Sequence, residues 1–175
     1  MFFYVNLIFE YYPWRQCMNS DKHLTELTSM VDLFVELETS LEHYYDLCAK
    51  IFPDEKFAWF GIATQEGIHA KIFKKLKEEI IKNPNKWQLG KYNYTALKTM
   101  VDTVHDKLKE IKEKRYVAKS VVSFAKDVES SLVESDIVNA FVSEGSDYIK
   151  MVNKIVEETD EHKEFMTRFL TMYES

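Results

Sequence analysis

Five ionisable side chains occupy positions where the sequence pattern otherwise predicts apolar residues facing a core: Glu38, Glu66, His69, Glu129 and His162. Glu66 and His69 are expected to be neighbours on one helix face, because residues three apart lie about 5–6 Å from each other. A carboxylate oxygen and an imidazole nitrogen at that spacing can bind one metal ion together. Oxygen ligands combined with imidazole suit iron, manganese or zinc better than copper(I) or calcium.

The five side chains are also predicted to lie at similar depth. Glu38 and Glu66 stand at similar distances before and after a predicted turn at Pro53, so antiparallel packing brings them level. Glu129 and His162 are related in the same way by a second turn. An unpaired buried carboxylate is unfavourable by several kcal/mol, so these groups need partners. The alternatives are glutamates that reach solvent and histidines that are hydrogen-bonded core residues.

Long amphipathic helices are predicted to position these side chains, because apolar residues recur at alternating steps of three and four. Pro53 and Gly145 mark the two tight turns, and the polar stretch 83–93 is expected to be a loop. The predicted helices span residues 21–52, 55–82, 95–114, 117–143 and 146–172. The third is expected to be a long crossover, which makes the chain an all-α four-helix bundle of two helix hairpins with one extra connecting helix.

The composition excludes several classes of protein. The 175 residues suffice for one domain, and 4 Gly and 3 Pro are too few turn residues for a barrel of many short strands. The net charge of −6 argues against nucleic acid as a partner. The two cysteines, Cys17 and Cys48, cannot build a disulfide framework, so a reducing, cytoplasmic setting is expected.

Residues 1–19 form a predicted N-terminal arm that differs from the bundle domain expected at 20–175. The arm begins MFFYVNLIFEYYPWRQC and is rich in aromatic residues but poor in charge. It is too short to span a bilayer, which takes about 20 apolar residues. Three interpretations stay open: the arm packs on a partner, it anchors the chain at a membrane surface, or it is not native and the protein begins at Met18. Membrane contact is expected only if the arm is such an anchor.

An internal repeat relates the two halves of the chain. LETSLE at 37–42 parallels VESSLV at 128–133, and IATQEGIHAKIF at 62–73 parallels IVEETDEHKEFM at 155–166. The repeat aligns Glu38 with Glu129 and His69 with His162. Duplication of a helix hairpin predicts a bundle with approximate twofold symmetry and its site on the axis.

The repeat is imperfect at one position, where Glu66 aligns with Thr159. Glu158 is one residue away, which is about 100° around a helix. Glu42, Glu158 and Glu161 are therefore assigned to the solvated surface. For Glu158 the alternative is that it substitutes for the missing carboxylate ligand.

Four stretches of the chain resemble the rubrerythrin branch of the ferritin-like superfamily: LETSLEHYYDLCAKIFPD, FAWFGIATQEGIHAKIF, FAKDVESSLVE and IVEETDEHKEF. The resemblance implies a ferritin-like bundle in which two irons react with peroxide or dioxygen, and it implies a homodimer. The ligands that it implies are Glu38, Glu66, His69, Glu129 and His162. It also implies that Tyr45 lies next to the ligands without itself binding the metal. The residues alone favour a core tyrosine whose hydroxyl has a hydrogen-bond partner.

Three features depart from the pattern of that family. Thr159 stands where a carboxylate ligand is expected, and Leu132 stands where rubrerythrins carry a further Glu. The rubredoxin-like Cys-x-x-Cys tail is absent from the sequence, so the electron donor is unknown. Two irons are expected if the site is intact and one if Thr159 disables it, with manganese or zinc as alternative metals.

Two classes of function are consistent with these residues. The first is a di-iron oxidoreductase of peroxidase or ferroxidase type, which reduces peroxide or dioxygen or oxidises ferrous iron. The second is a degenerate, non-catalytic bundle that binds one metal ion or none and serves as a scaffold or interaction module. Thr159 is the residue that motivates the second hypothesis.

Overall fold

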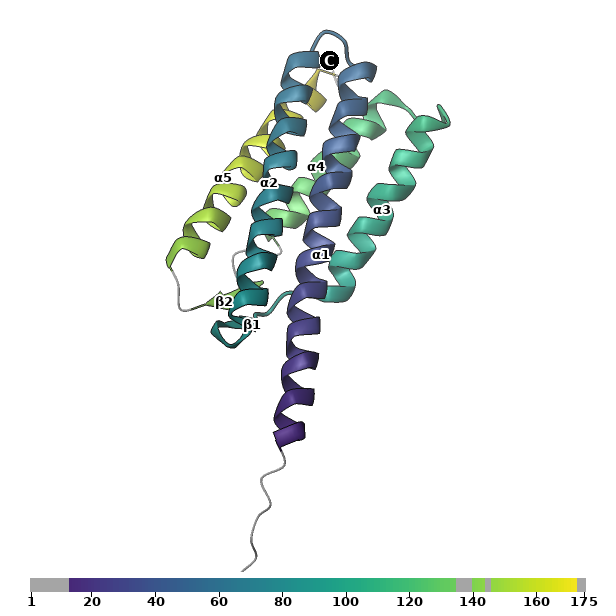
Figure 1. Cartoon of the computed structure of the whole chain (residues 1–175). Coiled ribbons are helices and arrows are strands. Elements are labelled where there is room, and N and C mark those ends of the chain that lie inside the picture. The colour runs from purple at the N-terminus through teal and green to yellow at the C-terminus, as the bar shows by residue number, and fades with distance from the viewer. Residues whose placement is uncertain (1–12, 135–139, 144–145, 173–175) are drawn as a thin grey trace, which may run out of the picture.

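The computed structural model describes residues 13–134, 140–143 and 146–172, and it is mostly helical (Figure 1). Within these ranges the chain forms five α-helices, one short 3-10 helix and two short strands. In chain order they are α1 (Pro13–Ile51), α2 (Lys56–Lys82), η1 (Pro84–Lys86), β1 (Trp87–Leu89), α3 (Tyr94–Lys112), α4 (Ala118–Glu134), β2 (Phe141–Ser143) and α5 (Ser146–Thr171). The all-α class expected from the sequence is confirmed.

Helix α1 is the central element of the fold. It packs along α2 on one side and along α3 on another, and α4 packs along α5 (Figure 1). The short turn at Pro53 makes α1 and α2 antiparallel neighbours, as predicted. Helix α3 is more than a connection, because its apolar stripe is buried through Leu97, Val101, Val104, Leu108 and Ile111.

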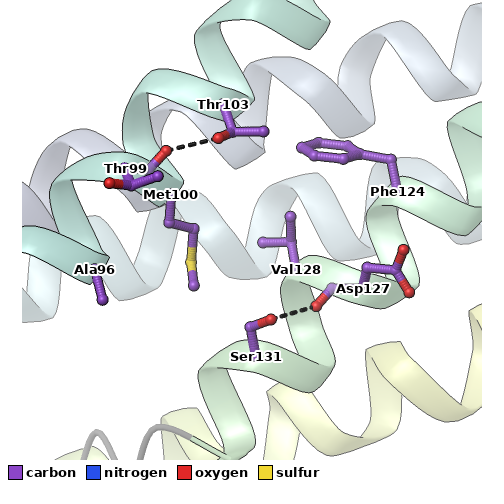
Figure 2. A pocket seen from close by; sticks show the side chains of 8 residues that line it. All are labelled: Ala96, Thr99, Met100, Thr103, Phe124, Asp127, Val128 and Ser131. Carbon is purple, nitrogen blue, oxygen red and sulfur yellow. Dashed lines mark hydrogen bonds between the residues drawn. The ribbon is translucent and has the colours of Figure 1, made fainter.

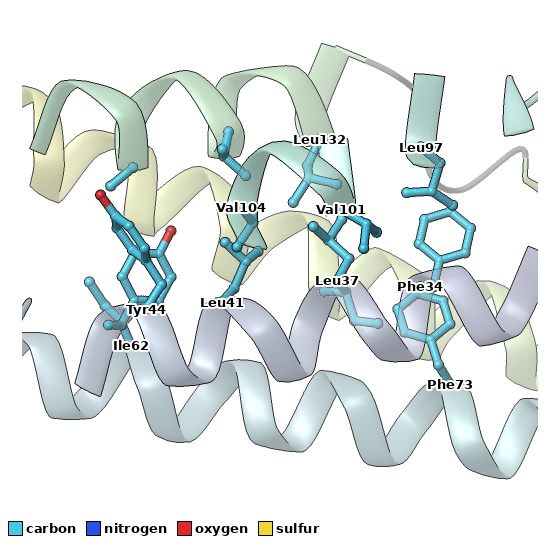
Figure 3. Packing of buried hydrophobic residues seen from close by; sticks show 14 of the residues in the cluster. Phe34, Leu37, Leu41, Tyr44, Ile62, Phe73, Leu97, Val101, Val104 and Leu132 are labelled. Carbon is cyan, nitrogen blue, oxygen red and sulfur yellow. The ribbon is translucent and has the colours of Figure 1, made fainter. Parts of the chain in front are cut away.

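The core is continuous along α1 because this helix buries two faces. Figure 3 shows Leu37, Leu41 and Tyr44 of α1 beside the apolar stripe of α3. Toward the β1–β2 end of the fold, Phe34 stacks on Phe73 of α2 with ring centroids 4.8 Å apart and 8° between the planes. Burial of this much apolar surface is the main favourable term that holds the helices together.

A two-stranded ribbon joins the two long connections of the chain. Strands β1 and β2 are antiparallel, with Trp87 opposite Ser143 and Leu89 opposite Phe141. Helix α1 contacts this ribbon through His23, whose Nε2 lies 2.9 Å from the carbonyl oxygen of Trp87. The ribbon therefore links the loop after α2 to the loop before α5.

The ribbon corrects one prediction from the sequence. A helix was expected over residues 117–143, but α4 ends at Glu134 and residues 141–143 form strand β2. Phe141 is 2% exposed and contacts Phe34, so this segment is held by partners distant in the sequence. Gly145, the expected turn residue, lies outside the described residues.

The start of α1 also differs from the predicted boundary. The helix begins at Pro13, inside the segment 1–19 that the sequence set apart as an arm, and it continues without a break into the core. Proline suits the first position of a helix, where its missing N–H has no intrahelical partner to lose. The rest of the arm, residues 1–12, lies outside the described residues. Over the described part of the chain, every helix is either too short or too polar to cross a membrane.

Candidate metal centre

Four helices contribute to one buried cluster of ionisable side chains. Helix α1 supplies Glu38, α2 supplies Glu66 and His69, α4 supplies Glu129, and α5 supplies His162. None of the five side chains is more than 3% exposed. The structure therefore brings together all five residues that the sequence singled out, although their role as ligands stays a prediction.

The first half of the cluster is centred on Nδ1 of His69. This nitrogen donates a hydrogen bond to Oε2 of Glu66 at 3.0 Å and lies 3.8 Å from Oε2 of Glu38. One ligand atom from each of the three residues lies within 4.8 Å of the other two. Such a group of two carboxylates and one imidazole can hold a cation.

The second half repeats this geometry around Nδ1 of His162. The nitrogen lies 2.9 Å from Oε1 of Glu66 and 3.8 Å from Oε1 of Glu129. One oxygen of Glu66 thus contacts His69 in the first half, and the other contacts His162 in the second half. The cluster has the approximate twofold symmetry predicted from the repeat, with Glu66 at its centre and the two imidazole rings 6.3 Å apart.

The cluster contains polar atoms that lack hydrogen-bond partners. Among the described residues, five buried side-chain nitrogen or oxygen atoms have none, and four of these belong to the cluster: Glu38 Oε2, Glu66 Oε1, Glu129 Oε2 and His162 Nδ1. Buried polar groups in folded proteins are almost always satisfied. Three of the four are carboxylate oxygens, and the fourth, His162 Nδ1, lies 2.9 Å from one of them, Glu66 Oε1. Carboxylate oxygens and imidazole nitrogens gathered in this way are ligands that a divalent cation takes, so these residues fit a metal ion.

Protons balance the charge of the cluster when no metal is present. Burial alone would lower the pKa of His69, but the carboxylates of Glu38 and Glu66 raise it to about 11. His162 behaves alike: burial opposes its charge, and Glu129 and Glu66 raise its pKa to about 10. Both rings are therefore imidazolium groups at neutral pH in the metal-free protein.

The three glutamates respond differently to burial. Desolvation and the charge of Glu66 raise the pKa of Glu38, and the same two causes raise the pKa of Glu129. Burial also opposes ionisation of Glu66, but its interactions with His162 and His69 outweigh burial and hold its pKa below the ordinary value. Glu66 is accordingly the carboxylate that stays ionised between the two imidazolium rings.

The outer nitrogens of the two histidines have partners of different charge. Nε2 of His69 donates to Oε2 of Glu158 on α5 at 2.8 Å, and Nε2 of His162 donates to Oε1 of Gln65 on α2 at 2.9 Å. Burial opposes the ionisation of Glu158, but His69, Lys154 and Gln65 lower its pKa, so the two outer partners interact. Metal-binding histidines in proteins donate their second ring N–H to a carboxylate or carbonyl in this way.

Glu158 corrects one assignment made from the sequence. It was placed on the solvated surface, but its side chain is 17% exposed and contacts His69 and, at 3.4 Å, Lys154. Gln65 was missed altogether. The repeat held the signal for both, because Gln65 aligns with Glu158 and each contacts the histidine of the other half. Glu161 is exposed as expected, whereas Glu42 is half-buried against the backbone of Gly67.

Tyr45 lies behind the cluster on α1. Its hydroxyl donates a short hydrogen bond to Oε1 of Glu129, and its ring stacks on Trp59 with centroids 5.9 Å apart. Burial and the charge of Glu129 raise the pKa of Tyr45, so the phenol keeps its proton and acts as a donor. Tyr45 therefore orients Glu129, which suits either role weighed from the sequence.

Thr159 occupies the position that the repeat aligns with Glu66. It lies on α5, one turn before His162, and is 4% exposed. Its short neutral side chain supplies no charge, and a hydroxyl is a poorer metal ligand than a carboxylate. The cluster therefore has one carboxylate at its centre where a fully symmetric site would have two.

A separate groove lies between α3 and α4, with a volume of 270 Å³. Figure 2 shows its lining: Ala96, Thr99, Met100, Thr103, Phe124, Asp127, Val128 and Ser131. None of these eight residues belongs to the buried cluster. Its hydroxyl groups donate to backbone carbonyls of their own helices, as Thr103 does to Thr99. The groove therefore offers few polar groups free to recognise a ligand.

Comparison of the chain with known protein families, curated proteins and solved structures gives no match. The class of site is consequently defined by its own geometry, a buried carboxylate–histidine cluster inside a helical fold.

Proposed function

We propose that the chain binds two divalent metal ions through Glu38, Glu66, His69, Glu129 and His162. The observation that carries this proposal is the shared position of Glu66, whose two oxygens lie 3.0 and 2.9 Å from the inner nitrogens of His69 and His162. A carboxylate placed between two equivalent groups can bridge two cations. A single cation would leave one half of the cluster without a partner.

We further propose that the fold is a ferritin-like four-helix bundle with α3 as an added helix. Its support is that two helix hairpins each supply one glutamate and one histidine, with Glu66 added by the first. This arrangement approximates the known di-iron and di-manganese carboxylate bundles, in which two helices each give a Glu and the other two each give a Glu-x-x-His motif. Thr159 breaks the second motif, so the correspondence is incomplete.

Iron is the proposed metal, with manganese and zinc as alternatives, because the ligands are carboxylates and imidazoles without thiolates. Two ferrous ions held there would supply the two electrons that convert hydrogen peroxide and two protons into two molecules of water. Glu38 and His69 would bind the ion of the first half, and Glu129 and His162 would bind the ion of the second half. Burial of all five residues limits the access of bulk water.

The proposed activity is that of a rubrerythrin-like oxidoreductase, which reduces peroxide or dioxygen or oxidises ferrous iron. The protein that supplies electrons is not identified by any residue of the chain. A homodimer, expected from the resemblance, also remains a proposal.

Metal content tests the proposal directly. Anaerobic loading of the whole chain with ferrous iron, desalting and elemental analysis should give two irons per chain. Glu66→Ala should lose both, because this residue serves both halves, whereas the exposed Glu161→Ala on α5 should retain both. Retention of two irons by Glu66→Ala would contradict the shared role of Glu66.

Reaction with oxidants tests the proposed chemistry. The ferrous-loaded protein should consume one peroxide for every two irons oxidised, at a rate well above that of free ferrous iron in the same buffer. If the loaded protein binds two irons but reacts no faster than free iron, the proposed metal binding stands and the proposed oxidoreductase activity is contradicted.

A second candidate function rests on Thr159. With one central carboxylate, the site has a ligand set rich enough for one ion but sparse for two. The chain would then be a degenerate bundle that binds one metal ion or none and acts as a scaffold. Metal content of one or zero per chain after loading would favour this candidate.

A further inference from the structure

The two halves of the cluster are alike on the inside and different on the outside. Toward Glu66, the two histidines make nearly equal contacts of 3.0 and 2.9 Å. On their outer nitrogens, His69 faces the carboxylate of Glu158 and His162 faces the amide of Gln65. Because Gln65 and Glu158 are equivalent in the repeat, one charge distinguishes the outer partners of the two histidines.

A carboxylate partner makes an imidazole a stronger ligand than an amide partner does. The negative charge draws the proton on Nε2 outward, which raises the basicity of Nδ1, the atom that faces the metal position. It also adds a negative charge close to the bound cation. The loss of such an outer partner typically lowers metal affinity by about 10- to 100-fold.

Tyr45 adds a second difference in the same direction. Its hydroxyl donates to Oε1 of Glu129, the carboxylate oxygen nearest to His162 in the second half. A hydrogen bond to a carboxylate oxygen draws electron density from that oxygen, so the oxygen donates less to a bound cation. Glu38 and Glu129 each keep one oxygen without a hydrogen-bond partner, so the difference between the two carboxylates is the hydrogen bond that Tyr45 donates to Glu129.

We propose that the two metal positions bind unequally, and that Glu158 is the positioning residue responsible. The position formed by Glu38, Glu66 and His69 takes the first cation, and the position formed by Glu66, Glu129 and His162 takes the second. This inference rests on the proposed two-metal function. It adds the order of filling and assigns a role to a residue outside the ligand set.

Titration of the metal-free chain with Co²⁺ tests the order of filling. Co²⁺ bound in four- or five-coordinate geometry absorbs visible light more strongly than free aqueous Co²⁺, so each binding step can be followed by absorbance. Wild type should show two steps whose dissociation constants differ at least tenfold. His69→Ala should remove the tighter step and His162→Ala the weaker one. The stoichiometry comes from the same titration.

Exchange of the two outer partners tests the role of Glu158. Glu158→Gln should weaken the tighter step by about 10- to 100-fold with little change in the weaker one. The double variant Gln65→Glu with Glu158→Gln keeps the net charge and should reverse the order of filling. Adding His69→Ala or His162→Ala to this double variant shows which position gives the tighter step. Glu157→Gln, an exposed neighbour on α5, is the control for loss of one charge and should change neither step.

The outcomes separate this inference from the proposed function. Binding of fewer than two Co²⁺ by wild type would overturn the two-metal function. Binding of two Co²⁺ with equal affinity, or an order that the double variant leaves unchanged, would overturn the inference alone. If Glu158→Gln fails to fold, the double variant still decides, because it restores a carboxylate at the outer nitrogen of the other histidine.

Discussion

Oε1 of Glu66 on α2 lies 2.9 Å from Nδ1 of His162 on α5, between residues almost a hundred positions apart in the chain. The other oxygen of the same carboxylate accepts a hydrogen bond from His69. One side chain therefore connects the first hairpin to the second through the centre of the core. The behaviour of the cluster toward protons, metals and substitutions depends on this connection.

Metal binding should release protons and strengthen as pH rises. The pKa values of about 11 for His69 and about 10 for His162 mean that both rings carry a proton on Nδ1 at neutral pH, and a metal must displace each one. Two bound ions should release at least two protons, one from each histidine, and affinity should rise by up to about tenfold per pH unit for each histidine. Calorimetric titration in buffers of different ionisation enthalpy measures the protons. His162→Ala should release about one fewer.

The metal-free protein should lose stability as pH rises above neutrality. A histidine whose pKa is raised on folding stabilises the fold fully below its unfolded pKa of 6.5, and this contribution fades as pH rises through the folded value. The free energy of unfolding should therefore fall between about pH 6.5 and pH 11. Denaturant unfolding across this range measures it. A metal-free protein that becomes more stable toward pH 9 would contradict the assigned protonation states.

Thr159→Glu should restore the second central carboxylate. In the metal-free protein this substitution should reduce stability, because a further buried carboxylate would face Glu66 without a cation. With metal, it should tighten binding if wild type already holds two ions, or raise the count from one to two if Thr159 disables a position. Elemental analysis and thermal unfolding with and without metal measure both effects. Thr159→Gln, similar in size but neutral, should not raise the metal count.

Tyr45→Phe should act on both stability and metal binding. Loss of the hydroxyl leaves Oε1 of Glu129 without its donor, which should lower the free energy of unfolding of the metal-free protein by about 1–3 kcal/mol. It should also strengthen the position that contains Glu129 and His162. Tyr44→Phe is the matched control, because its hydroxyl donates to the backbone oxygen of Val121 at 2.9 Å, away from the cluster. That variant should lose stability but leave Co²⁺ binding unchanged.

Lys114→Gly should stabilise the chain. Lys114 follows α3 with φ of 57°, and the bonds from its N–H to Ile111 and from Arg115 to Glu110 form a Schellman motif. Glycine adopts this left-handed conformation without steric strain, so the gain should be about 0.5–1 kcal/mol. Thermal unfolding should shift upward by about 1–3 °C. Lys112→Gly, inside the last turn of α3, should shift it downward.

Helical periodicity allowed much of the fold and the centre of the site to be predicted from the sequence. A polar residue inside an apolar stripe must face inward, and the repeat indicated that Glu38, Glu129, His69 and His162 are equivalent pairs. The sequence pattern did not correctly predict how Glu129 and His162 come to be level, however. They were expected to be level because a turn at Gly145 joined two long helices, yet they meet although α4 ends at Glu134 and strand β2 intervenes.

The order of residues by itself determined which faces of the helices are buried, because a period of 3.6 residues is a property of one segment alone. Only the tertiary structure decided which neighbours those faces meet. Glu158 and Gln65 lie one position off the stripes and reach the histidines because α2 and α5 approach each other there. The pairing of β1 with β2 and the packing of α3 on α1 likewise depend on contacts between distant segments, which no local pattern records.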